Sequence, residues 1–230
     1  MKNIKVVKYM NIDKRYINQI EVMISMFTIK DGKLKVLLFR RDEDPFKGYW
    51  MLPSNLLMTN ETLEECAEAT IDEFVGLEEV YLEQCHLFSQ VDRLPNDRIL
   101  ASSFISLIDS KSIELKRKKR SFHSEWFSID SIPKMVYDYA AIVENAIEFL
   151  RHRMLNISML KNLYPSDFTL PELQVLYEQV LGKELDRRNF RKKFVNLDLI
   201  EDTGYQTGGH NGRPAKLYRF KEHIEDKILF

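Results

Sequence analysis

The sequence predicts an α+β protein built of two parts, and three observations support this prediction. The first two thirds of the chain are mainly short, apolar, β-branched segments between turn residues, with helical spacing over 61–74 and 137–155. After residue 167 helical spacing dominates, until two short strand-like segments near the end. Glycine (8) and proline (7) are scarce among the 230 residues, which favours regular elements with short connections. We therefore expect one domain over 13–155 and a second over 156–230.

The first domain is expected to open with a β-hairpin. Segments 21–28 (EVMISMFT) and 34–39 (LKVLLF) are apolar and β-branched with partial alternation, and Asp31-Gly32 between them supplies turn chemistry. The next stretch, 41–55, is rich in turn residues, and we assign it no regular element.

An amphipathic helix is expected over 61–74. Its apolar positions recur every four residues, Thr62 is a candidate N-cap, and Gly76 stands just past the end. Three strands and a long closing helix follow, at 80–88, 99–108, 125–129 and 137–155. The charged run KRKKR at 116–120 falls between two of these strands, where a solvated loop explains it better than a phosphate contact.

The second domain is expected to begin with two helices. The first, 169–182, carries Pro171 in its first turn and ends at a glycine, as the positional preferences of these residues require. The second begins after Asp186, which is a candidate N-cap, and continues through the basic sequence RRNFRKKFVN.

The rest of this domain indicates a wing. Phe190, Phe194 and Val195 are expected on the inner face of the basic helix, which leaves its cations on the remaining surface. Two short strands, 197–204 and 213–220, follow on either side of a glycine-rich turn. Helix, short turn, basic helix and hairpin together predict a winged helix-turn-helix.

The net charge hides an uneven distribution. The chain has 34 Lys plus Arg against 35 Asp plus Glu, a formal charge of −1, which argues against a uniformly basic nucleic-acid coat. Segment 182–221 nevertheless carries ten basic against five acidic residues (+5), leaving 24 against 30 (−6) elsewhere. A cationic surface on a helix that fits the major groove is typical of duplex binding, because each neutralised phosphate releases condensed counterions.

The basic helix is expected to read DNA and the helix before it to position the domain. A solvated basic helix on a protein-interaction module explains the charge cluster equally well, but the wing, with Arg213-Pro214 at its tip, favours DNA. We expect the contacts to come from Arg187, Arg188, Asn189, Arg191, Lys192, Lys193, Arg213 and Lys216.

The composition sets the cellular context that we expect. No stretch reaches the roughly 18 apolar residues that a membrane span needs, and charges interrupt the apolar positions of residues 1–16. A soluble, cytoplasmic protein is therefore expected. Cys66 and Cys85 are too few for a zinc site or a disulfide framework, so we expect reduced, buried thiols and no cofactor.

Residues 45–77 resemble the Nudix box and the residues that lead into it. The family pattern is Gly, five residues, Glu, seven residues, then Arg-Glu-apolar-any-Glu-Glu-any-Gly-apolar. With the last two positions placed on Gly76 and Leu77, the chain matches the pattern at Glu61, Ile71, Glu73, Gly76 and Leu77. It departs from the pattern at Asn55, Ala69, Thr70 and Phe74. The resemblance implies a Nudix-like mixed sheet between helices.

Two of these departures fall on the metal-binding positions of the family. Positions 70, 73 and 74 share one helix face, where three carboxylates of a working hydrolase hold divalent cations. Here the face offers Thr70, Glu73 and Phe74. Asp72 is a poor substitute because it lies about 100° around the helix from Glu73, and Glu65 is better explained as a first-turn acid that favours the helix dipole. We expect no metal site and impaired hydrolase activity.

A degenerate Nudix domain joined to a winged helix resembles the Nudix-related transcriptional regulators, a family with members that respond to ADP-ribose or to arabinose. The match is most specific in FTLPELQVLYEQVLGKELDRRNFRKKF, followed by LIEDTG and GRPAKLYRF. It covers nearly all of the chain after about Asp13. The resemblance implies a homodimer on a palindromic operator, with a first domain that senses an ADP-ribose-like nucleotide or a pentose.

The effector pocket is expected to combine arginines with an aromatic ring. Arginine binds phosphate bidentately, and a tryptophan face suits a base or a sugar. Our candidates are Arg40, Arg41, Trp50, Arg93 and Arg98. Trp50 suits the core equally well, and Arg40 and Arg41 face opposite sides if they continue a strand.

Two alternatives of other classes stay open. An active Nudix pyrophosphatase would release phosphate from nucleoside diphosphate sugars in the presence of magnesium, through Glu73. A protein-interaction adaptor would associate with DNA only weakly and with little dependence on salt. The operator, the regulated genes and the direction of regulation are not encoded in these patterns.

Overall fold

A mixed β-sheet forms the centre of the N-terminal domain. The computed structural model describes residues 19–30, 32–78, 80–108, 123–153, 167–207 and 214–221. Within these ranges the sheet has seven strands: β1 (Ile20–Lys30), β2 (Lys33–Arg40), β3 (Trp50–Met51), β4 (Ser54–Leu56), β5 (Tyr81–Phe88), β6 (Leu100–Leu107) and β7 (Ser124–Ser128). The order is β3-β2-β1-β6-β5, with β4 also paired to β1 and β7 to β2. Strands β1 and β6 are parallel and the other described pairs antiparallel.

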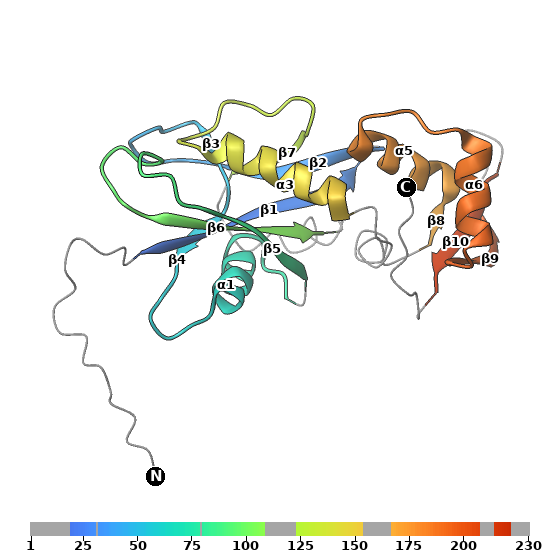
Figure 1. Ribbon diagram of the computed structural model, residues 1–230, viewed down its shortest axis with the longest axis horizontal. Helices are drawn as coiled ribbons and strands as arrows, with labels where there is room; N and C mark the ends of the chain where they lie inside the picture. Colours follow the sequence, from blue (N-terminus) through green and yellow to red (C-terminus); the bar gives the residue numbers. More distant parts are fainter. Residues whose placement is uncertain are drawn as a thin grey trace, which may run out of the picture.

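Helices cover both faces of this sheet (Figure 1). Helix α1 (Leu63–Val75) lies on one face and α3 (Tyr139–Arg153) on the other. Side chains of β1 alternate between the two layers, since Met23 and Phe27 pack with α3 whereas Ile24 packs with α1. Because both faces are covered, seven consecutive residues of β1 are buried, which explains why its sequence alternates only partially.

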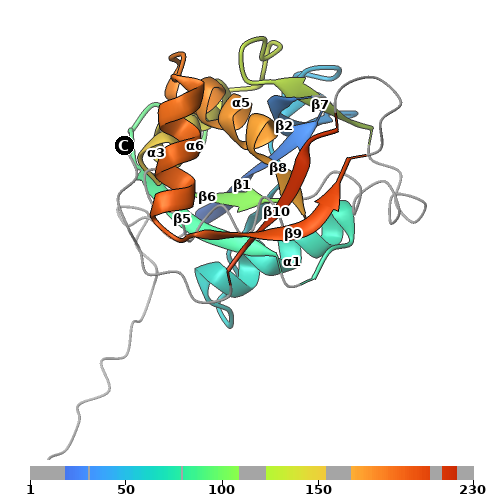
Figure 2. The same cartoon turned by 90° about the vertical axis from the view of Figure 1, so that its right-hand side faces the viewer.

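The C-terminal residues form a winged helix, as expected (Figure 2). Its elements are β8 (Phe168–Thr169), α5 (Leu170–Leu181), α6 (Arg187–Asn196), β9 (Ile200–Gln206) and β10 (Lys216–Phe220). The strands form a small antiparallel sheet in the order β8-β10-β9. Thr169 and Glu172 form a capping box at the start of α5, and Gly182 ends that helix in the left-handed conformation.

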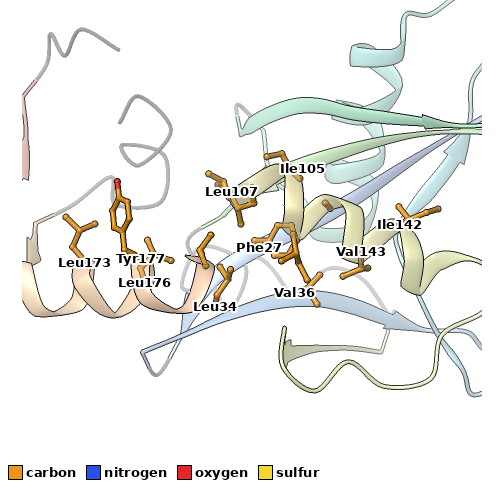
Figure 3. Packing of buried hydrophobic residues seen from close by; sticks show 14 of the residues in the cluster. Phe27, Leu34, Val36, Ile105, Leu107, Ile142, Val143, Leu173, Leu176 and Tyr177 are labelled. Carbon is orange, nitrogen blue, oxygen red and sulfur yellow. The ribbon is translucent and has the colours of Figure 1, made fainter. Parts of the chain in front are cut away.

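The winged helix shares its apolar core with the N-terminal domain (Figure 3). Leu173 and Leu176 of α5 belong to the same buried cluster as Leu34 of β2. Polar contacts fix the same junction. The Gln179 side chain donates to the Gly32 carbonyl oxygen and accepts from the Leu34 N–H, each at 2.5 Å.

Helix α3 holds the same end of α5. Nε of Arg151 donates to the carbonyl oxygen of Val180 at 2.7 Å. The last turn of α5 is thus attached to two elements of the N-terminal domain, the β1–β2 hairpin and α3, while α6 lies on the far side of the domain (Figure 1).

The expected elements are confirmed, with three differences. Phe168 and Thr169, at the start of the expected helix, form the short strand β8, and α5 begins at Leu170. Strands β3 and β4 lie in the stretch 41–55, to which we assigned no element, because such short strands depend on pairing with β2 and β1. Helix α3 begins at Tyr139, not Tyr137, because Tyr137 has φ +44°, which is outside the helical region. The domain boundary at 155/156 and the run 116–120 lie outside the described residues. No helix in the described ranges is long and apolar enough to span a membrane.

Candidate nucleic-acid interface and effector site

Two phenylalanines anchor helix α6 to its domain. The Asp186 carboxylate accepts the N–H of Asn189 at 2.8 Å, so the expected N-cap is confirmed. Phe190 and Phe194 are buried, and each ring meets Tyr177 of α5 edge-on, with centroids 5.5 and 5.6 Å apart. These contacts turn the opposite face of α6 to the solvent.

That outer face presents cations without partners. Four side chains are exposed and form no hydrogen bond or ion pair within the described ranges: Arg187, Arg188, Arg191 and Lys192. Asn189 is exposed as well, whereas Lys193 is half-buried. Unpaired cations on a protruding helix keep their full charge available for phosphates.

One residue of α6 differs from our expectation. We placed Val195 on the inner face, and this was wrong, because Val195 is 50% exposed. The buried direction is set by Phe190 and Phe194, and Val195 lies about 100° around the helix from Phe194.

The cations of the wing, in contrast, are paired. Nζ of Lys216 lies 2.6 Å from Oδ2 of Asp202. This hydrogen bond lowers the pKa of Asp202 and raises the pKa of Lys216. Two further pairs join Lys221 to Asp198 at 2.7 Å and Arg219 to Asp167 at 2.8 Å. Arg213, which we expect at the wing tip, lies outside the described residues.

A hollow with both polar and apolar walls lies between α5, α6 and the wing. Its volume is about 560 Å3, and Arg187, Arg191 and Lys216 line it together with Gln174 and Gln206. Guanidinium, ammonium and amide groups around one opening are suited to a phosphate oxygen. Three of the DNA contacts predicted from sequence, Arg187, Arg191 and Lys216, are thus brought around one hollow by α6 and β10.

Helix α1 begins and ends as its capping residues, Thr62 and Gly76, predict. The Thr62 hydroxyl accepts from the N–H of Glu65 at 3.1 Å, and the Glu65 carboxylate accepts from the N–H of Thr62 at 2.8 Å. Glu61 accepts the N–H of Met58 at 2.7 Å, and Gly76 terminates the helix with φ +69°. Both acids at the start of α1 thus have local structural roles.

Two of the three metal-face positions are used for packing. Thr70 is fully buried, and its hydroxyl donates to the carbonyl oxygen of Cys66 at 2.7 Å. The Phe74 ring meets Phe39 of β2 edge-on, with centroids 5.0 Å apart. Burial raises the pKa of the Cys66 thiol to about 11, so this apolar layer keeps it protonated.

The third position of the metal-binding face, Glu73, keeps its carboxylate, but positions 70 and 74 beside it do not carry the carboxylates of the family pattern. Glu73 accepts a hydrogen bond from Nδ2 of Asn55 at 2.9 Å, while Ala69 is exposed. Nowhere in the described ranges do three or more His, Cys, Asp or Glu side chains gather so that they could hold a metal ion. One carboxylate between a buried hydroxyl and a phenyl ring does not fit the divalent cations that the Nudix fold uses.

Arg93 belongs to a buried network and not to an open pocket. Its guanidinium binds the Asp138 carboxylate bidentately, at 2.9 and 3.1 Å, and lies 3.6 Å from Oε2 of Glu21. The other Glu21 oxygen accepts hydroxyl protons from Tyr139 at 2.9 Å and Ser54 at 2.8 Å. Burial, and next to it the charge of Glu21, raise the pKa of Tyr139 well above its usual range. The network ties β1, β4 and α3 together.

Two other candidates for effector binding, Arg41 and Arg98, form hydrogen bonds with backbone carbonyl groups of nearby loop residues. Arg41 donates from Nε to the Pro45 carbonyl oxygen at 2.7 Å. Arg98 donates to the carbonyl oxygens of Ser89 and Gln90, each at 2.9 Å. The sequence indicated arginines near the sheet edge, but it did not indicate these partners.

Arg40 and Trp50 remain together at the end of β2. They are directly paired in the sheet, so their side chains share a face. The Trp50 ring packs edge-on against Phe127 at 4.6 Å and lies 5.7 Å from the His123 ring. Arg40 is exposed, and its guanidinium lies beside Gly48. We did not predict His123, because no pattern around it marks a site.

The fold and the α6 surface define a class, a DNA-binding regulator that carries a Nudix-like domain. Residues 151–220 match the family model for the NrtR DNA-binding winged helix domain. The chain is 30% identical over 203 residues to the "ADPR responsive transcriptional repressor NtrR" of Acinetobacter baylyi, which covers 86% of this chain and 80% of that protein. The chain therefore belongs to the NrtR family of transcriptional regulators.

Two solved structures resemble most of the chain, and a further relative resembles part of it. The crystal structure of Shewanella oneidensis NrtR complexed with a 27mer DNA has a TM-score of 0.77 at 28% identity, over 88% of this chain and 93% of that chain. A MutT/nudix family protein from Enterococcus faecalis shares the fold, with a TM-score of 0.66 at 22% identity and 88% of each chain covered. The chain is also 28% identical over 132 residues to the ADP-ribose pyrophosphatase of Methanocaldococcus jannaschii, which covers 57% of this chain and 77% of that protein.

Proposed function

We propose that this regulator represses transcription by binding operator DNA through α6 and releases it when ADP-ribose binds the Nudix-like domain. The observation that carries the DNA part is the set of four exposed, unpaired cations on α6. The effector is supported by the names of two relatives, the ADPR responsive repressor and the ADP-ribose pyrophosphatase. A pentose effector, which we also expected, has no such support.

The effector contacts that we propose are centred on Arg40 and Trp50. These two candidates share a face of the sheet, and Arg40 keeps its guanidinium exposed. A diphosphate suits that guanidinium, and a ring of the ligand suits the indole. Arg41, Arg93 and Arg98 are left out of these proposed contacts because their guanidinium groups already have partners in the protein.

A mobility-shift assay tests the proposal directly. The full chain is incubated with fragments of the genome that encodes it, at several salt concentrations, with and without ADP-ribose. We expect a sequence-selective complex that weakens steeply with salt and dissociates with ADP-ribose. The absence of any selective band over competitor DNA rules out the regulator mechanism, whereas a selective band unaffected by ADP-ribose rules out only the effector.

Thermal unfolding with a ligand panel identifies the effector independently of DNA. ADP-ribose, NAD, other nucleotides and pentoses are compared at equal concentration. A ligand at about 100 times its dissociation constant adds roughly 2.7 kcal/mol of stability. We expect this shift with ADP-ribose and its loss in Arg40→Ala, with Arg98→Ala as the matched arginine control. A shift with arabinose alone contradicts the proposal.

Hydrolysis is the second candidate function, because one relative is an ADP-ribose pyrophosphatase. We propose that this chain binds ADP-ribose without hydrolysing it, since Thr70 and Phe74 stand where the Nudix pattern has carboxylates. The measurement is magnesium-dependent formation of AMP and ribose 5-phosphate from ADP-ribose, and of the nucleoside monophosphate and sugar phosphate from nucleoside diphosphate sugars. Turnover well above background that is lost in Glu73→Gln establishes the enzyme instead.

The assembly that we propose is a homodimer in the cytoplasm, with the sensor over 13–155 and the reader over 156–230. One ten-residue recognition helix reaches a single half-site, and a two-fold dimer places two such helices about one helical turn of DNA apart. Sedimentation velocity of the full chain, free and on a selected duplex, gives the stoichiometry. One chain per duplex contradicts the dimer.

A further inference from the structure

An exposed valine interrupts the cationic face of the recognition helix. Val195 is 50% exposed in the last turn of α6, and the two phenylalanines that anchor the helix are both buried. Its side chain is therefore not required by the core of the domain. A single exposed valine is ordinary on a protein surface, so its position on the helix decides whether it has a use.

Val195 continues the stripe of side chains that is turned away from the core. Arg188 and Lys192 precede it by seven and three residues, and this spacing puts all three on one side of the helix. The stripe covers about 10 Å along the axis, at 1.5 Å per residue. A helix that enters the major groove with this side inward brings Val195 to the base edges together with the two cations.

The space beside Val195 is large enough for a base edge. A hollow of about 500 Å3 lies between α6 and the wing strands. Its lining combines Val195 with Arg188, Arg191, Lys192 and Asn196 on the helix and Ile200, Asp202 and Tyr218 on the strands. The Val195 side chain itself offers no donor or acceptor to a polar base edge, but it gains from contact with a methyl group.

The chemistry of the groove leaves one partner for an apolar side chain. Guanine, cytosine and adenine present donors and acceptors in the major groove, whereas thymine also presents its C5-methyl group. We propose that Val195 contacts the 5-methyl group of a thymine and thereby selects a T·A pair in each half-site. This assignment rests on the proposed operator binding and adds one base-specific contact in each half-site.

The test removes the methyl group and the valine separately. Duplexes that the full chain selects from a random pool are resynthesised with deoxyuridine in place of one thymine at a time. At one position per half-site we expect the affinity of the unchanged chain to fall about threefold to fivefold, as for one buried methyl or methylene group. Val195→Ala is expected to lose a similar factor on thymine DNA and nothing further on deoxyuridine DNA.

A matched control separates this contact from general effects. Val175 of α5 is also exposed, at 37%, and Val175→Ala should change neither affinity. Thermal unfolding should be unchanged in both variants, because neither side chain is buried. The proposal is overturned if deoxyuridine lowers the affinity of the unchanged chain at no position. It is also overturned if Val195→Ala lowers the affinity by the same factor on thymine DNA and on deoxyuridine DNA. Recovery of no selective duplex overturns operator binding itself.

Discussion

Arginines are used in opposite ways in the loops of the Nudix-like domain and on helix α6. In the Nudix-like domain, Arg41 and Arg98 donate to carbonyl oxygens of their own loops, and Arg93 is buried against a carboxylate. On α6, Arg188 and Arg191 are exposed and have no partner in the described ranges. The same side chain therefore stabilises structure at these three positions of the Nudix-like domain and keeps its charge free on α6.

This difference shows why a count of charges predicts the DNA surface better than the effector pocket. A phosphate backbone needs only cations that reach the solvent, which a basic exposed helix supplies by itself. A pocket needs an arginine whose partners are absent, and partners are a tertiary property. Arg93 meets Asp138 from a position 45 residues away, so no local pattern reveals the pair.

The largest effect expected is on stability, from Arg93→Ala. It leaves the carboxylates of Asp138 and Glu21 without their cation, and breaking a buried pair typically costs about 3–5 kcal/mol. Because Asp138 keeps 22% exposure of its side chain, we expect about 2–4 kcal/mol. Chemical denaturation measures it. The control, Arg98→Ala, should cost less than about 1 kcal/mol. If both variants lost the same free energy of unfolding, the buried network of Arg93 would be no more important for stability than the loop contacts of Arg98.

Arg188→Ala and Lys192→Ala should have the next largest effect, on DNA affinity. A lost base contact costs about 1–3 kcal/mol, and a lost phosphate contact lowers the salt slope by about one. The free energy of unfolding should stay within about 0.5 kcal/mol, because both side chains are exposed. Titration of a selected duplex at several salt concentrations measures both quantities. If Arg41→Ala weakened DNA binding as much, the difference between the arginines that hold loops and the arginines on α6 that bind DNA would be contradicted.

Gln179→Ala tests the junction between the domains. It removes two hydrogen bonds to the β1–β2 hairpin, which we expect to cost about 1–2 kcal/mol, since each typically contributes about 0.5–1.5 kcal/mol. The effect of ADP-ribose on DNA affinity should shrink, while each ligand alone still binds. Calorimetry of each ligand in the presence and absence of the other measures this coupling. An unchanged coupling would show that the signal takes another route.

Lys216→Met should have the smallest effect. The folded pKa of Asp202 lies below its usual 3.8 because Lys216 donates to it, so the pair stabilises the fold above that pH and loses its contribution as pH falls through the folded pKa. Without Lys216 the pKa of Asp202 should rise toward 3.8, as followed by NMR of the carboxyl carbon. DNA affinity should fall less than in Arg188→Ala, because Lys216 already has a partner. An unshifted Asp202 would contradict the pairing.

The elements were predictable from sequence because their signals are local. Thr62 and Asp186 cap the helices that they were expected to cap, and the apolar spacing identified both layers of the main sheet. Strands β3, β4 and β8 were missed because two- and three-residue strands have no pattern of their own. Val195 was misplaced for a simpler reason, since helical phase, counted from the two phenylalanines, already put it outside.

The contact between Gln179 and the β1–β2 hairpin limits how this chain can vary. Its amide recognises backbone groups of Gly32 and Leu34, so side-chain substitutions in the turn leave the partners in place. An insertion there moves the carbonyl oxygen and the N–H out of reach together. Related sequences should therefore keep the length of this turn, and at position 32, where φ is +67°, they should keep glycine or another residue that accepts the left-handed conformation.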